Sequence, residues 1–415
     1  MSNSSSHSDG LAVHSEYGRR LQVGERTFGS RCSLANMVKE LDRQKASKHD
    51  FIADSRSLEV IVQNDSTNNP VLCLAPKTAQ VGEWFPDGPV PLGYDAIAQL
   101  GHRSSAVKGG VPTRWLRNLL KEHPDECARH LSELLVLTSR KRLIRCLDNR
   151  VRAFLSNRYK IWDHYDFAFA ALDTARAFGG EVLEAQLTDK HMRLKMTTKE
   201  TWDIVHTTRS SDDGNWYAGA LGNQTLLNRV AARRWDDLPG GPDTVTPLVT
   251  IEHSETGHGG LNIKLGILAG ICFNLATVQH VVRERHLGGE IDEGVLSDEA
   301  RSADSEAVRL KARDYITTAF EPERFKALIA EIKASQTDEI AAPAAAVDNA
   351  MKALSIGENK RDELLAYFIR DYEPTRFGLA QAVGRLAQDT DNPDEATRLE
   401  EAAGELLIKR ELVAV

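Results

Sequence analysis

Residues Arg140 to Asp166 read RKRLIRCLDNRVRAFLSNRYKIWDHYD. Its first 21 residues hold eight Lys or Arg and one acid, in a chain of 415 residues whose net charge is -8. Two strand-compatible segments, KRLIRCL and RVRAFLS, flank Asp148 and Asn149, which are residue types that tolerate the left-handed conformation. The pattern predicts a β-hairpin that turns at these two residues and leads into a helix.

Alternation along the second strand of this hairpin predicts that Val151, Ala153 and Leu155 form its core face. Arg150 and Arg152 would then point together, away from the core.

A second cationic hairpin is predicted from EVLEAQLTDKHMRLKMTTK, residues 181–199, with a turn at 188–190. In its second strand Arg193 and Lys195 alternate with the apolar Met192 and Leu194. Alternation therefore predicts an apolar core face and an opposite face that is cationic.

The wider pattern predicts an α+β fold, in which a central mixed or antiparallel sheet carries packed helices and is flanked by helical modules at both ends. Four regions are expected: a disordered tail over 1–29, an N-terminal α/β and helical module over 30–137, a central domain over 138–290 with an insertion at 207–243, and a helical region over 291–415. Within the second region a helix–break–helix pattern also allows a helix-turn-helix reader, although a packing module with solvated charges explains it better.

Composition predicts a globular protein of the cytoplasm. The hydrophobic fraction is 41% and the charged fraction 27%, and the longest apolar run, at 265–275, is far short of the roughly 20 residues that cross a bilayer. The N-terminal MSNSSSHSDG has neither the cations nor the apolar core of a signal peptide. The five cysteines lack zinc-site spacing, which favours buried free thiols.

Charge is distributed unevenly along the chain. Residues 101–160 carry 14 Lys/Arg against 5 Asp/Glu, whereas residues 289–340 carry 7 against 13. A local basic face can bind a polyanion even in an acidic protein. The same asymmetry allows a homo-oligomer in which acidic C-terminal helices of one subunit meet the basic strip of another.

The cationic hairpins are the main candidate site for nucleic acid, because cations contact phosphates and nearby rings can stack on the bases of a single strand. Phe154, Tyr159, Trp162 and Tyr165 supply the possible rings. Two alternatives are a solvated sheet edge and arginines that pair with the protein's own acids. The candidate binding residues are Arg142, Arg145, Arg150, Arg152, Arg158, Lys160, Arg193 and Lys195.

The glycine-rich loop at residues 253–260 is a weaker candidate, for acid–base catalysis or metal binding. His253 and His258, with Glu255, would be the minimum set, and His286 could join them by folding. Glu255, His258 and His286 are the weak catalytic candidates. These residues lack a recognised ligand spacing, so no metal and no cofactor are predicted. The chain also lacks the Gly-x-Ser-x-Gly element of serine hydrolases and the glycine motifs that bind phosphates.

Several segments, in the same order, resemble the phage/plasmid-like protein family, a domain of unknown function. They span roughly residues 95–410 and include RAFLSNRYKIWDHYD, EVLEAQLTDKHMRLKM, IEHSETGHGGLNIKLGILAGICFN, RHLGG, EPTRFGLAQAVGRLAQD and ATRLEEAAGELL. The resemblance implies a passenger of phages, plasmids or integrated elements, and it implies no reaction. The layout of strands around a helix is similar in outline to phage single-strand annealing proteins, an analogy that does not carry function by itself.

Together these patterns favour a DNA-binding protein of a mobile element, with single-stranded DNA in replication or recombination as the expected ligand. The first alternative is a non-catalytic structural or interaction protein of such an element. The second is a hydrolase or metal-dependent enzyme that uses the loop at 253–260.

Overall fold

The fold is known from a computed structural model. It describes residues 11–14, 20–23, 32–103, 113–137, 140–177, 179–188, 190–197, 203–204, 244–269, 275–284, 298–319, 321–390 and 393–413.

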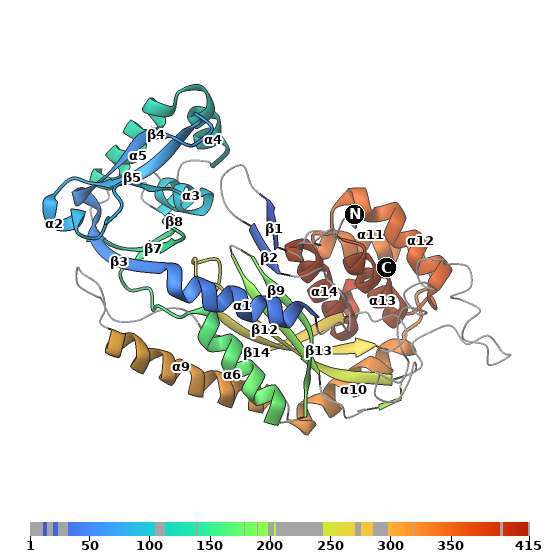
Figure 1. The fold of residues 1–415 in the computed structure, drawn as a ribbon. Helices are drawn as coiled ribbons and strands as arrows, with labels where there is room; N and C mark the ends of the chain where they lie inside the picture. Colours follow the sequence, from blue (N-terminus) through green and yellow to red (C-terminus); the bar gives the residue numbers. More distant parts are fainter. Residues whose placement is uncertain are drawn as a thin grey trace, which may run out of the picture.

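The architecture is α+β, as predicted, with antiparallel sheets and packed helices (Figure 1). The central sheet has the strand order β14-β13-β12-β10-β9, and β11 pairs with β12. The strands of this sheet are β9 (Glu181–Leu187), β10 (Met192–Thr197), β11 (Asp203–Ile204), β12 (Thr244–His253), β13 (Leu261–Ala269) and β14 (Leu275–Glu284).

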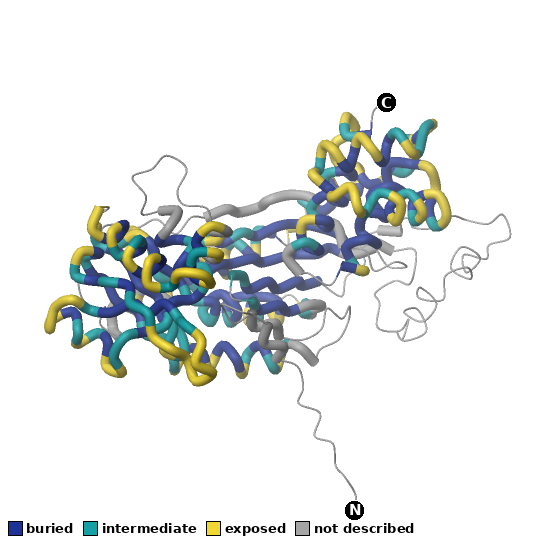
Figure 2. Tube along the Cα trace, turned by 90° about the horizontal axis from the view of Figure 1, so that it is seen from above, coloured by how far each residue is buried: buried dark blue, intermediate teal, exposed yellow. Residues whose placement is uncertain are grey.

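One face of the central sheet is apolar because alternate residues on its strands are hydrophobic. Met192, Leu194 and Met196 are fully buried there, in one core with Phe167 of α6 (His164–Ala177). Helix α9 (Asp298–Ala319) packs on α6, and α1 (Cys32–Ser47) lies against β9 and α6. Figure 2 shows the dark-blue buried strands between the more exposed ends of the molecule.

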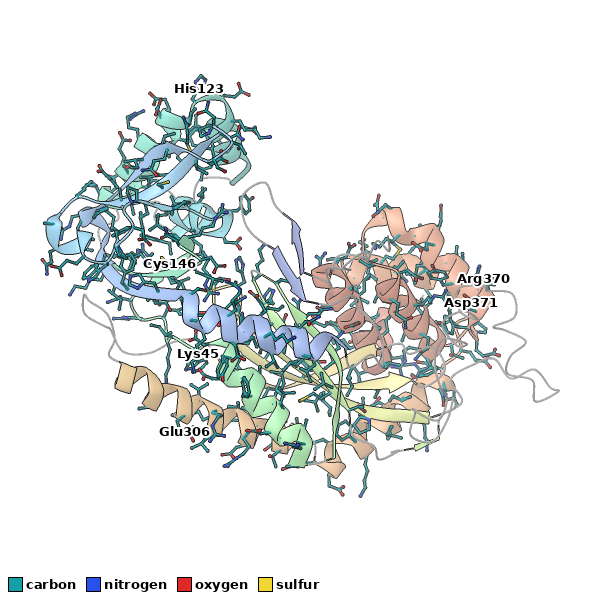
Figure 3. The ribbon with its side chains drawn as sticks, in the orientation of Figure 1. Lys45, His123, Cys146, Glu306, Arg370 and Asp371 are labelled. Carbon is teal, nitrogen blue, oxygen red and sulfur yellow. The ribbon has the colours of Figure 1, made fainter. Side chains whose placement is uncertain are left out.

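The N-terminal lobe, at the upper left of Figure 1, holds two three-stranded sheets with the orders β3-β7-β8 and β4-β5-β6. Cys146 lies inside this lobe, whereas Glu306 projects outward from α9 (Figure 3). The elements of the lobe are β3 (Lys48–Asp54), η1 (Ser55–Ser57), β4 (Leu58–Asn64), β5 (Pro70–Pro76), α2 (Ala79–Gly82), β6 (Val90–Pro91), α3 (Tyr94–Arg103), α4 (Thr113–Glu122), α5 (Pro124–Leu137), β7 (Lys141–Leu147) and β8 (Arg150–Ser156).

The pairing of β3 with β7 moves the predicted boundary at residue 138. Phe51 of β3 pairs with Ile144 of β7, and both belong to the core of the N-terminal lobe. The β7–β8 hairpin is therefore part of this lobe and not of the central sheet. Alternation predicts that a segment is a strand, but it does not say which distant strand will pair with it.

The C-terminal lobe is helical, as expected, and lies at the right of Figure 1. Helices α13 and α14 pack on each other, and α14 also packs on β14. Its elements are α10 (Pro322–Gln336), α11 (Pro343–Ala353), η3 (Glu358–Lys360), α12 (Arg361–Asp371), α13 (Arg376–Gln388), α14 (Pro393–Ile408) and η4 (Arg410–Leu412).

The ends of the chain, its cysteines and its helices bear on three further expectations. The tail over residues 1–29 contains two paired strands, β1 (Leu11–His14) and β2 (Arg20–Val23). The other residues of the tail and the insertion at 207–243 lie outside the described part of the chain. Cys73, Cys127 and Cys146 are buried free thiols, as predicted. Among the described residues, no helix is both long and apolar enough to span a membrane.

Candidate nucleic-acid interface

The quoted stretch forms the predicted hairpin. Asp148 and Asn149 have φ values of 52° and 51°, as a two-residue type I′ turn requires. The turn is anchored to α1, because the Arg43 guanidinium contacts the Asp148 carboxylate at 2.5 Å.

A β-bulge in β8 interrupts the alternation of its side chains. Arg145 pairs with Ala153 but Cys146 pairs with Val151, so Arg152 is the extra residue. A bulge breaks the alternation of faces. Val151 therefore packs in the core of the N-terminal lobe, whereas Ala153 packs on the opposite side of the sheet.

The predicted core face of Val151, Ala153 and Leu155 is consequently wrong, because the bulge divides these residues between the two sides of the sheet. Arg150 lies beside Gly93, where α3 begins, and Arg152 binds Glu255 in the loop between β12 and β13. The sequence shows strand alternation but not the extra residue that interrupts it.

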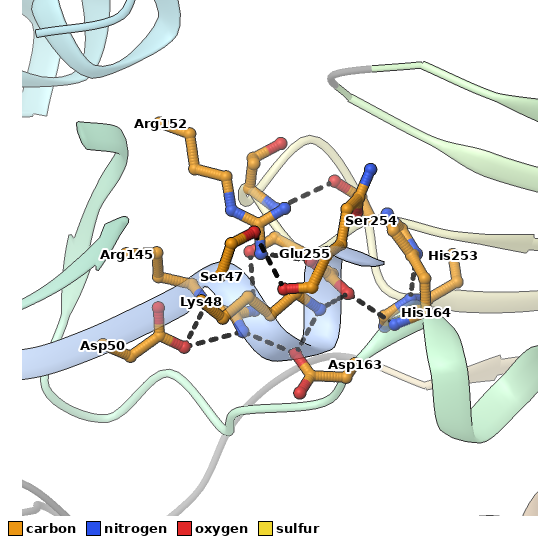
Figure 4. A network of polar contacts seen from close by, with 12 residues as sticks. Ser47, Lys48, Asp50, Arg145, Arg152, Asp163, His164, His253, Ser254 and Glu255 are labelled. Carbon is orange, nitrogen blue, oxygen red and sulfur yellow. Dashed lines mark hydrogen bonds and ion pairs between the residues drawn. The ribbon is translucent and has the colours of Figure 1, made fainter. Parts of the chain in front are cut away.

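Arg145 and Arg152 belong to a buried ionic cluster, which we call the junction cluster (Figure 4). It joins the β3-β7-β8 sheet of the N-terminal lobe to the loop that follows β12. Its members are three cations and three carboxylates: Lys48, Arg145, Arg152, Asp50, Asp163 and Glu255.

Arg145 is fully buried and uses its whole guanidinium inside the junction cluster. Nε donates to Asp50 at 3.0 Å, Nη2 donates to Asp163 at 2.7 Å, and Nη1 donates to the Glu255 carbonyl at 3.1 Å. The three hydrogen bonds connect Arg145 to three separate segments of the chain, because the planar guanidinium group presents several N–H donors in fixed directions. Arg145 is therefore unavailable to a phosphate.

Glu255 is the central anion of the junction cluster and is fully buried. Its carboxylate accepts from Lys48 Nζ at 2.7 Å, from Arg152 and from the backbone N–H of His164. Burial raises the pKa of Glu255, but the charge of Arg152 and the other cations outweighs burial and holds the pKa well below its ordinary value. A carboxylate with three donors and no exposed surface suits a structural anchor better than a general base.

The other residues of the weaker candidate site do not gather around Glu255. His258 lies at the surface, with Nε2 3.3 Å from the Asp95 carboxylate of α3, and His286 lies outside the described residues. Within the described part of the chain, no group of three or more His, Cys, Asp or Glu is placed to hold a metal ion.

A pair of buried histidines borders the junction cluster. The Nδ1 atoms of His164 and His253 are 2.9 Å apart, so one ring donates a hydrogen bond to the other. Burial lowers the pKa of His164 to about 3, so this imidazole is neutral in the folded protein at neutral pH.

Folding stability should consequently fall between pH 6.5 and pH 5. In this range the unfolded chain binds a proton at His164, with an ordinary pKa of 6.5, and the folded chain does not. The free energy of unfolding should therefore decrease with falling pH by about 1.4 kcal/mol per unit from this group. Urea titrations at pH 7, 6 and 5 measure the slope, which should be smaller by that amount in His164→Gln. An equal slope in both proteins would contradict the assignment.

The cationic face of the second hairpin is also closed. Lys195 Nζ lies 2.8 Å from the Glu400 carboxylate of α14, and these side chains are 1% and 2% exposed. Arg193 Nε and Lys264 Nζ each lie 2.8 Å from Glu252. The prediction of an open cationic face is wrong here because α14 covers the sheet.

Charge balance explains why α14 fits this surface. The sheet contributes Arg193, Lys195 and Lys264 against Glu252, and α14 supplies Glu400 and Glu401, the latter bound to Lys264. The acids that meet these cations thus come from the same chain. The uneven charge of the sequence therefore gives no argument for an oligomer at this surface.

The remaining predicted binding residues differ in exposure. Arg142 is buried, and its guanidinium carbon lies 5.7 Å from the centroid of the Phe154 ring. The Nζ atom of Lys160 lies 5.5 Å from the centroid of the Trp162 ring. Arg158 is exposed.

Arg158 lies at one end of the β3-β7-β8 sheet with three cations that sequence reasoning did not select. Strand register places Lys141 opposite Asp54, and backbone hydrogen bonds join Ser55 to Arg140. Arg140 is exposed, Lys141 is partly exposed, and Arg56 is 64% exposed while pairing with Asp54. We call this surface the basic edge: Arg56, Arg140, Lys141 and Arg158.

Comparisons with protein-family models, with curated proteins and with solved structures find no match to this chain. The resemblance to the phage/plasmid-like family therefore stays a prediction from the quoted segments.

Proposed function

We propose that this protein binds a nucleic-acid strand through the basic edge. The observation that carries the proposal is the meeting of cations from η1, from the start of β7 and from the turn after β8 at one end of a sheet. Asp54, a neighbouring carboxylate, engages Arg56, and the charge of Lys141 also helps to lower the pKa of Asp54.

Two features support a phosphate ligand at this surface. Lys and Arg that remain exposed can neutralise phosphates and release the counterions condensed on them. The strands also hold the cations in fixed register, since Arg142 of β7 pairs with Ser156 and the N–H of Arg158 donates to the Ser156 hydroxyl. On the family resemblance, the setting would be replication or recombination of a phage- or plasmid-type element, in the cytoplasm of a bacterial or phage-infected cell.

The binding residues in this proposal differ from those expected from the sequence. The basic edge retains Arg158 and replaces the buried Arg145, Arg193 and Lys195. No catalytic step is included, because the Glu255 carboxylate is occupied by donors of the junction cluster.

Salt-dependent anisotropy of a labelled single strand of about 30 nucleotides tests the proposal, at a length that spans more than one site. The double variant Arg140→Ala/Arg158→Ala should reduce the salt slope of log K by about 1.4, and the affinity roughly 25-fold at about 0.1 M salt, as expected for two lost phosphate contacts.

A matched control removes two exposed cations elsewhere. Arg309→Ala/Lys326→Ala changes residues of α9 and α10 that are 39% and 67% exposed, and it should leave the binding curve unchanged. No affinity at low salt, or equal losses in the two double variants, would refute the proposal.

A further inference from the structure

The aromatic rings that were expected to stack on bases pack against the fold of the protein. Phe154 and Trp162 are 1% and 4% exposed, and each belongs to a hydrophobic core. Tyr159 packs against the cluster that contains Ile52, and its hydroxyl donates to the Ser254 carbonyl at 2.9 Å. Phe154 and Trp162 are therefore inaccessible to a base, and the partly exposed Tyr159 is held against the fold by its packing and its hydrogen bond.

Tyr165, the fourth predicted ring, is likewise engaged. It is partly buried against the central core, its ring lies 4.4 Å from that of Phe169, and the Lys45 ammonium lies 4.3 Å from its centroid. It also belongs to the first turn of α6, beyond the segment that carries Arg158.

One large aromatic side chain of the N-terminal lobe is exposed, but it lies away from the basic edge. Trp115 on α4 is 46% exposed and packs edge-on against His130 of α5, with 5.4 Å between ring centroids. His130 precedes Leu137, the last residue of α5, by two helical turns, or about 10 Å along the axis. Among the residues that the structure describes, the edge thus presents guanidinium and ammonium groups without a fully exposed aromatic ring.

We propose, on the basis of the proposed function, that the ligand is recognised through its sugar-phosphate backbone and that the bases contribute no affinity. The ligand class is then any phosphodiester strand, single or double. This follows because phosphate contacts are independent of sequence and of base pairing, whereas a preference for single strands requires stacked bases.

Anisotropy with three labelled ligands of equal length tests this on the full-length protein: a mixed-sequence single strand, a fully abasic single strand, and a duplex. The abasic strand should bind within about twofold of the normal strand, and the duplex should bind at least as tightly because its phosphates are denser. One stacked base would instead favour the normal strand by roughly five- to 150-fold.

Two variants sharpen the result. Trp115→Leu keeps an apolar contact with His130 and should leave all three affinities unchanged, while Arg140→Ala/Arg158→Ala should weaken all three together. A normal strand that binds fivefold or more above the abasic strand, or a loss in Trp115→Leu for the normal strand alone, would overturn backbone recognition while leaving nucleic-acid binding intact. If none of the three ligands binds at low salt, the proposed function itself fails.

Discussion

Replacing Glu255 by glutamine is expected to lower the free energy of unfolding by about 3–5 kcal/mol, because it leaves buried cations without their counter-charge. Glu255 is fully buried, and its carboxylate is bound by Lys48 and Arg152, which are 7% and 15% exposed. The amide of glutamine keeps the shape of the side chain but removes its charge. Chemical denaturation followed by circular dichroism measures the change.

The matched control for this prediction is Glu323→Gln on α10. Its carboxylate pairs with Lys326 and is 81% exposed, so its loss should change stability by less than about 0.5 kcal/mol. If Glu255→Gln costs no more than this control, the junction cluster does not hold the N-terminal lobe to the central sheet.

Replacing Lys195 by methionine should have a cost of similar size, about 3–5 kcal/mol, because Glu400 would remain buried as an uncompensated charge. The double variant Lys195→Met/Glu400→Leu should recover most of that loss, since well-packed apolar residues often replace a buried ion pair at little or no cost. Measuring the single and double variants separates the burial of a lone charge from the value of the pair.

An exposed ion pair provides the control: Glu405 lies on α14, and Lys409 directly follows this helix. Their contact is 2.7 Å, yet the side chains are 42% and 45% exposed. Lys409→Met should therefore leave the free energy of unfolding nearly unchanged, because solvent screens the pair. A double variant at Lys195 and Glu400 that stays as unstable as Lys195→Met would show that the sheet–helix contact depends on the charges themselves.

Local features of the fold were predictable because their causes are local. Two residues that accept positive φ determine the turn at Asp148 and Asn149. Alternation of Met192 and Leu194 with polar residues determines the apolar face of β10. The presence of both cationic hairpins and the α+β class follow from such patterns.

The exposure of the cations was not predictable in the same way. Arg145 and Arg158 occur in one short segment with the same charge, yet the first is fully buried and the second exposed. The difference comes from Asp50, which pairs with Arg145 from a strand about 95 positions away in the chain. Sequence alone gives no distance between such residues.

The strands, the turn and the concentration of positive charge between Arg140 and Lys160 follow from residue type and from neighbours along the chain. Which of these charges are available to a ligand depends on contacts between distant segments of the chain. Tertiary contacts place four of the eight predicted binding residues in ion pairs within the fold. Asp50 and Asp163 pair with Arg145, Glu255 with Arg152, Glu252 with Arg193, and Glu400 of α14 with Lys195. The physical reason is that burying a charge is costly unless an opposite charge is buried with it, and that partner can come from any part of the chain.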